Sequence, residues 1–170
     1  MSSNPTLTTC LAILMLSGCP DFGSMVYRID LAAKRVTVVI RDLRTDDPDD
    51  AIADFATIVE AVADPDEDVF TDAHAEMVEE GGELVVRWEA TYSDLSTLDV
   101  YQHDRRSPYL WCVDRPHRST VSSTTGTVPE ELPGCVVFDR KTKVLEFAVR
   151  QDVSDTASLL PQFHALKARD

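Results

Sequence analysis

The chain has 170 residues, of which 44% are hydrophobic and 27% charged, with nine prolines and six glycines. This composition is typical of one ordinary globular domain and excludes a disordered, collagen-like or multi-pass membrane protein. Its formal net charge of −14 argues against a nucleic-acid-binding protein, and four cysteines are too few for a disulfide-rich scaffold.

The first segment is apolar and carries no charged side chain. Residues 7–16 read Leu-Thr-Thr-Cys-Leu-Ala-Ile-Leu-Met-Leu, and the first ionisable acid is Asp21. A membrane-spanning helix needs around 20 apolar residues, so this run is too short to span a bilayer. Its length is typical of the hydrophobic core of an export signal, which places Cys10 inside the leader.

The residues that follow this run are Leu16-Ser17-Gly18-Cys19. They resemble the lipobox of bacterial lipoproteins, in which a large aliphatic residue and two small residues precede a cysteine. The resemblance implies a signal peptide over residues 1–18, cleavage between Gly18 and Cys19, and lipid attachment to the Cys19 thiol. Two or three acyl chains, palmitate among them, would anchor the domain in the cell envelope. The alternative is a buried amino-terminal helix or strand with Cys19 as a packed thiol.

The exported part is predicted as a short tether over residues 19–24 and a single domain over residues 25–170. Alternating apolar side chains predict a hairpin of two strands, at residues 25–31 and 35–43. Asp47 and Pro48 predict a helix start, and that helix is expected to end near Asp64.

Further elements follow from the same patterns. A second short helix is expected from Thr71 to Gly81, and a strand over residues 84–92. Shorter strands are predicted at residues 109–113 and 135–139, the latter pairing with residues 143–150 through a tight turn. A Ser/Thr-rich loop is expected over residues 118–133, and a last helix capped by Ser154. The predicted fold is therefore α+β, with an antiparallel sheet of hairpins covered on one face by two or three helices.

Two cysteines, Cys112 and Cys135, remain once the leader and the lipid site are set aside. In an exported protein they are expected to form a disulfide across the Ser/Thr-rich loop. The alternatives are two buried thiols, or a catalytic Cys112 beside His117.

Charge is unevenly distributed along the sequence. Residues 45–86 contain 15 acidic side chains and no lysine or arginine. A solvated surface explains such a run most simply, whereas a docking face for a cationic protein partner is the functional alternative. Asp64, Asp66, Glu67 and Asp68 resemble half of an EF-hand loop, but Val69 and Ala75 replace its essential glycine and glutamate, so no EF-hand is expected.

Basic and aromatic residues alternate over residues 103–118, where four arginines accompany Tyr109 and Trp111. Such a segment could stack on a sugar or contact anionic headgroups. The simpler expectation is that Arg105, Arg106, Arg115 and Arg118 offset the acidic stretch of the same domain.

Motifs of known catalytic chemistry do not occur in the sequence. The four histidines, at positions 74, 103, 117 and 164, have no metal-ligand spacing, and no catalytic residue, metal or cofactor is predicted. We therefore expect a non-catalytic binding or structural module, anchored to the outer rather than the inner membrane because Pro20, not Asp, follows Cys19. The alternatives are a lipid-anchored hydrolase with dispersed Asp, Glu and His, or an acidic inhibitor of a basic envelope enzyme.

Overall fold

The computed structural model describes residues 21–63, 70–113 and 118–169. A curved antiparallel sheet runs in the order β3-β4-β2-β1-β8-β6, and the short β9 pairs with the end of β2. Its strands are β1 (Asp21–Asp30), β2 (Arg35–Thr45), β3 (Phe70–Glu80), β4 (Glu83–Tyr92), β6 (Ser119–Thr124), β8 (Val144–Gln151) and β9 (Ala157–Ser158). A second sheet pairs β5 (Tyr109–Cys112) with β7 (Cys135–Phe138), and the helices are α2 (Ala51–Ala63), the 3-10 helix η1 (Leu95–Leu98) and α3 (Leu160–Lys167). This arrangement is α+β, as expected.

The predicted first hairpin is confirmed, but β1 begins earlier than expected. Asp21 pairs with Arg44 of β2, and Phe22 is only 4% exposed. Residues 21–24 therefore belong to the sheet and not to a tether, which is a correction to the expected boundary at residue 25. Phe22 is apolar and buried, and the antiparallel pairing of β1 with β2 continues through Asp21. Both features extend the strand beyond the alternating residues from which the boundary was predicted.

Helix α2 ends at Ala63, where the sequence predicted its end, but starts later than expected. Residues 48–50 form a turn in which an Asp47 carboxylate oxygen accepts the Asp49 N–H at 2.9 Å. Three buried side chains, Ala51, Phe55 and Ile58, then follow at helical spacing. Asp47 thus caps the preceding turn instead of the helix.

The expected helix at residues 71–81 is wrong, since this segment is the edge strand β3. It pairs with β4 from Phe70 to Glu80, and the two-residue connection Gly81-Gly82 has positive φ at both positions. Such a turn matches the twist of a hairpin, and glycine adopts it without a Cβ clash. Ala, Glu and Met favour helices intrinsically, but pairing with the strongly apolar β4 decides the conformation.

Two expectations about the later strands are also corrected. Strand β7 pairs with β5, and β8 pairs with β1 and β6, so the expected hairpin of residues 135–139 with 143–150 does not form. Residues 119–124, expected inside a loop, form β6 at the edge of the main sheet. Because strands β1 and β8 come from opposite ends of the described chain, their pairing has no local signal in the sequence.

The last helix is shorter than expected from a Ser154 cap. Ala157 and Ser158 form β9, and α3 begins at Leu160 with Pro161 in its first turn. Proline at this place has no N–H to leave unpaired, so it favours a helix start here.

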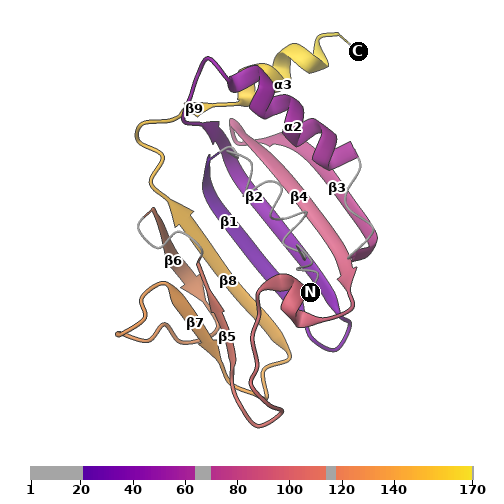
Figure 1. Cartoon of the computed structure of the whole chain (residues 1–170). Helices are drawn as coiled ribbons and strands as arrows, with labels where there is room; N and C mark the ends of the chain where they lie inside the picture. Colours follow the sequence, from indigo (N-terminus) through magenta and orange to yellow (C-terminus); the bar gives the residue numbers. More distant parts are fainter. Residues whose placement is uncertain (1–20, 64–69, 114–117, 170) are drawn as a thin grey trace, which may run out of the picture.

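The core lies between the main sheet and the elements packed on it. Figure 1 shows α2 and α3 near one another at the β3–β4 end of the sheet, and β5 and β7 beside β8 and β6. Phe55, Ile58 and Phe163 join the buried core from the helices. In the same core, the Trp111 ring of β5 lies 4.2 Å from the Phe147 ring of β8, measured between centroids. The small β5–β7 sheet therefore covers part of the main sheet, which was expected to be covered by helices alone.

Candidate functional site

The predicted disulfide between Cys112 and Cys135 is present. The two residues are directly opposite one another in the β5–β7 pair, with their Cα atoms 4.0 Å apart. Because the Cys112 sulfur is bonded, it is not a free nucleophile, and the catalytic alternative for this cysteine is wrong. His117 lies outside the described residues.

The predicted lipid site at Cys19 and the cleavage site at Gly18 also lie outside the described residues. The described chain starts two residues later, at Asp21, whose carboxylate is buried and accepts a 2.8 Å hydrogen bond from Arg118. Two residues of extended chain reach about 7 Å. Cys19 is therefore close, along the chain, to the Asp21 end of the sheet.

The acidic stretch is partly neutralised within the fold. Glu80 bonds both Arg41 and Arg87, and Glu79 lies 2.8 Å from the His164 ring nitrogen. The two guanidinium groups lower the pKa of Glu80 and Glu80 in turn raises that of Arg87. Asp64, Asp66, Glu67 and Asp68, which resemble half of an EF-hand loop, lie outside the described residues. In the part of the chain that is described, no group of three His, Cys, Asp or Glu side chains could hold a metal ion.

The basic and aromatic segment does not form one stacking surface. Trp111 is only 8% exposed because it packs on Tyr27 and Phe147 in the core. Arg118 pairs with Asp21, outside the acidic stretch, and Arg115 is not described. Arg105 and Arg106 are exposed and form no ion pair among the described residues. The expectation that these arginines offset the acidic stretch is therefore wrong for Arg118 and stays a prediction for Arg115.

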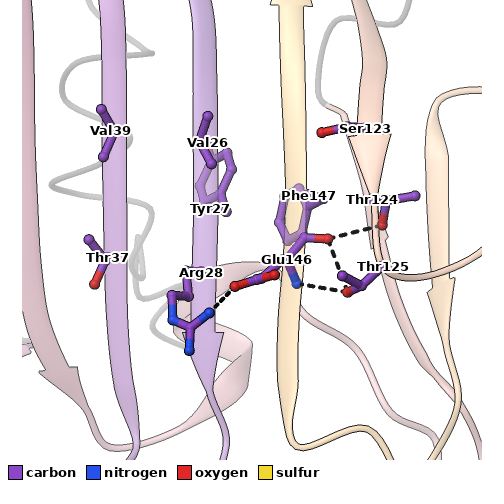
Figure 2. A pocket seen from close by; sticks show the side chains of 10 residues that line it. All are labelled: Val26, Tyr27, Arg28, Thr37, Val39, Ser123, Thr124, Thr125, Glu146 and Phe147. Atoms are coloured by element: carbon purple, nitrogen blue, oxygen red, sulfur yellow. Dashed lines mark hydrogen bonds and ion pairs between the residues drawn. The ribbon is translucent and has the colours of Figure 1, made fainter.

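A shallow depression of about 490 Å³ crosses the outward side of strands β2, β1, β8 and β6 (Figure 2). Val26 lies at its centre and is 41% exposed, because it alternates along β1 with the core residues Met25 and Tyr27. The Arg28–Glu146 ion pair crosses its floor, as Figure 2 shows. The hydroxyls of Thr124 and Thr125 donate to the Glu146 carbonyl at 3.1 and 3.4 Å. Most polar groups here already have partners within the protein.

A second depression of about 490 Å³ lies at the end of the sheet opposite Asp21. Three tyrosines line it: Tyr92 is buried, Tyr109 is half-buried and Tyr101 is 60% exposed. Hydrogen-bonding side chains of Lys34, Asp94, Ser96 and Gln102 complete the wall. Aromatic rings with a few polar groups at fixed positions are typical of small-ligand sites.

The local backbone fixes these groups in place. The Lys34 carbonyl accepts the Tyr92 N–H at 3.0 Å, and the Lys34 ammonium donates to the Ser93 carbonyl at 3.4 Å. Tyr101 and Leu110 exchange two backbone hydrogen bonds of 2.8 Å, which hold the Tyr101 segment against β5. Hydrogen bonds from the Ser96 hydroxyl and N–H keep the pKa of Asp94 below its ordinary value of 3.8. Asp94 therefore accepts hydrogen bonds as a carboxylate at neutral pH.

Three segments lie at this end of the sheet, and we call them together the loop end: residues 31–34, 93–108 and 139–143. The Leu31 N–H donates to the Lys143 carbonyl at 2.9 Å, which joins the first segment to the third. The pairing of Tyr109 with Phe138 brings residues 93–108 beside residues 139–143. Figure 1 shows these connections together at the bottom of the sheet.

Six cations lie at the loop end, and no pattern in the sequence predicted that they belong to one surface. None forms an ion pair within the described residues. Six arginines elsewhere pair with carboxylates, namely Arg28, Arg35, Arg41, Arg44, Arg87 and Arg118, whereas the exposed Arg150 and Arg169 do not pair within the described part of the chain. The six cations of the loop end are Lys34, Arg105, Arg106, Arg140, Lys141 and Lys143, and all are exposed. They are spread over more than a hundred sequence positions, so no short stretch of the sequence contains them all. The sequence could have predicted only the turns in which they lie.

Comparisons with protein families, with curated proteins and with solved structures found no match. Among the described residues, no helix combines the length and the apolar character needed to cross a bilayer. The function is therefore argued from the sites themselves.

Proposed function

We propose that this protein is a cell-envelope lipoprotein, anchored through Cys19, whose domain is a non-catalytic binding module. The observation that carries the proposal is the order of two features along the chain: Leu16-Ser17-Gly18-Cys19 follows the uncharged apolar run, and the strand β1 (Asp21–Asp30) follows Cys19. A signal peptide has to end before the folded domain begins, and the order of these two features along the chain fits that requirement. The Cys112–Cys135 disulfide also supports export, since disulfides persist in oxidising compartments.

The binding role is supported by the shape and chemistry of the outer surface. We propose that the helices and the small β5–β7 sheet cover the same side of the main sheet. The opposite side, around Val26, is then open to solvent. Each of the two depressions contains one carboxylate, Glu146 or Asp94, and neither is lined by a histidine. A hydrolase would place a general acid and a general base together in such a site. We therefore propose binding in preference to hydrolysis.

The lipid anchor is tested by intact-mass spectrometry of membrane-extracted protein. The wild type is expected to begin at Cys19 and to carry the added mass of its acyl chains. Cys19→Ala should keep the leader and gain no lipid, because it lacks the thiol that accepts the diacylglyceryl group. Cys10→Ala is the matched control, since this cysteine lies in the same leader and should leave with it. An intact, unacylated amino terminus in the wild type would contradict the proposal.

The outer membrane is the proposed location, because Pro20 occupies the place where an aspartate signals retention in the inner membrane of bacterial lipoproteins. Separation of the two membranes on a density gradient tests this assignment. The wild type should be found with the outer membrane, and Pro20→Asp should move it to the inner membrane.

A cationic protein is a second candidate partner, at the other end of the sheet from the loop end. Four exposed aspartates, at positions 46, 47, 49 and 50, lie next to Ile52, which is 77% exposed. An acidic surface with an apolar side chain beside it fits a basic partner, and the charges would speed association. Salt-sensitive binding of polylysine that falls when Asp49 and Asp50 become Asn would support this role, and unchanged binding would exclude it.

A further inference from the structure

We infer that the loop end binds an anionic polysaccharide, one whose sugar rings carry carboxylate groups. This inference deepens the proposed binding role by giving it a ligand class. The contacts it uses lie entirely within the folded domain, and only the argument from position rests on the proposed anchor at Cys19.

The first argument is local charge. The loop-end segments hold six cations and four carboxylates, a sum of +2, while the rest of the chain sums to −16. The carboxylates here are occupied by their own turns: Asp104 accepts the N–H groups of Arg106 and Ser107, and Asp139 accepts that of Lys141. These bonds hold the pKa of Asp104 below its ordinary value of 3.8. Lys34 interacts electrostatically with Asp94, whereas the other five cations form no ion pair among the described residues.

The second argument is the aromatic depression at the loop end, which Lys34 lines among the six cations. Tyr101 presents an exposed ring, and Tyr109 and Tyr92 continue the aromatic wall inward. A sugar ring has apolar C–H faces that pack on such rings, and hydroxyls that need hydrogen-bond partners. Asp94 and Gln102 supply an acceptor and an amide in the same depression. Cations alone would suffice to bind a ligand that offers only negative charge. The tyrosines and the Gln102 amide are additional groups that fit a sugar ring.

The third argument is position. Strand β1 runs ten residues from Asp21 to Asp30, which separates its ends by about 30 Å at the rise of an extended strand. In the proposed lipoprotein, the loop end is therefore at the end of β1 opposite the anchor, where a polymer outside the membrane could reach it.

The test measures binding of polygalacturonate, a sugar polymer with a carboxylate on every ring, to the purified full chain in detergent. We expect binding at low salt that weakens as salt is added. Dextran, which has rings without charge, and polyglutamate, which has charge without rings, should each bind at least about tenfold more weakly. Vesicles of phosphatidylglycerol test the membrane alternative and should bind no better than polyglutamate.

Variants separate the loop end from general electrostatics. Arg140→Gln with Lys141→Gln should weaken polygalacturonate binding about tenfold. The matched control, Arg150→Gln with Arg169→Gln, removes the same charge from exposed arginines outside the loop end and should change binding less than about twofold. Tyr101→Ala should weaken binding at least about threefold while leaving the melting temperature unchanged.

Three results would overturn the inference: no binding of polygalacturonate, equal binding of polyglutamate or of the vesicles, or equal loss in the two double variants. Because the measurement is made in solution, failure here leaves the lipid anchor standing, and loss of the anchor in the mass measurement leaves this inference standing.

Discussion

Tyr92 is the titratable group whose pKa the fold shifts furthest. Burial, strengthened by the negative charge of Asp30, raises the pKa of its phenol to about 12 from 10.0. Its hydroxyl donates to the Asp30 carbonyl at 3.3 Å, and the ring closes the inner end of the loop-end depression. A raised pKa adds stability that is complete below pH 10 and is lost as the pH rises through 12.

Replacing Tyr92 by Phe tests this shift. The wild type should lose stability, relative to Tyr92→Phe, as the pH increases from about 10 to 12, and a phenolate absorbance step near pH 12 should be missing in the variant. The measurement is thermal unfolding together with ultraviolet absorbance across this range. Identical alkaline titrations of the two proteins would contradict the assignment.

Glu80 has the opposite dependence on pH. Hydrogen bonds from Arg87 and Arg41 lower its pKa below the ordinary 4.5, so it stabilises the fold above that pH and loses its effect as the pH falls through its lowered pKa. Glu80→Gln should lower the melting temperature at pH 7, and the difference should disappear in acid. Glu83→Gln, in the same hairpin but without a described ion pair, is the control and should have little effect at either pH.

The functional residues differ in how far the sequence predicts them. Cys112 and Cys135 could be paired in advance, because two cysteines remained and both lay in strand patterns. Lys34 and Lys143 could not be placed together, since only the pairing of β1 with β8 joins their turns. The neighbouring arginines left a stacking surface at Trp111 open as an alternative, but its ring is buried beside Phe147, where an aromatic side chain gains more than in solvent.

At the scale of elements, α2 offers a matched pair of isoleucines. Ile58 is fully buried in the core, whereas Ile52 on the same helix is 77% exposed. Ile58→Ala should lower the free energy of unfolding by about 2–5 kcal/mol, since it leaves a cavity between helix and sheet. Ile52→Ala should change it by less than about 0.5 kcal/mol in urea unfolding. Equal effects of the two variants would contradict the docking of α2 described here.

The disulfide joins β5 to β7 and closes a loop with a sequence separation of 23 residues. Replacing both cysteines by serine should cost about 3 kcal/mol, chiefly because the unfolded chain gains freedom. Urea unfolding with and without a reductant measures this cost. Reduction should bring the wild type to the level of the double variant and leave the variant unchanged; a wild type insensitive to reductant would show that the bond adds no stability.

Strand β3 shows what local patterns miss. Its alanines, glutamates and methionine favour a helix by intrinsic propensity, and the glycines after it suited a helix end. In the fold, Ala73, Ala75 and Met77 alternate toward the core, and Gly81-Gly82 turns the chain into β4. Strand β4, with its clear alternation, was predicted correctly because it is buried on the sheet and carries strong β-formers.

At the scale of the whole molecule, charge and topology give the protein two different ends. The Asp21 end carries the exposed aspartates at positions 46–50, and the loop end carries the unpaired cations. Composition alone gave only the net charge of −14, which argues against nucleic-acid binding but does not reveal this division between the two ends. The fold resolves it because antiparallel strands bring distant turns to the same end of a sheet.

Membrane flotation tests the central claim, that Cys19 attaches a separately folded domain to a membrane. Protein expressed in a bacterial host with a lipoprotein export pathway is mixed with dense sucrose and centrifuged, and each fraction is probed. We predict that wild type and Cys10→Ala rise with the lipid after losing the leader, whereas no leaderless form of Cys19→Ala floats. The account would be contradicted if a leaderless Cys19→Ala floated as the wild type does, or if the wild type stayed in the dense layer.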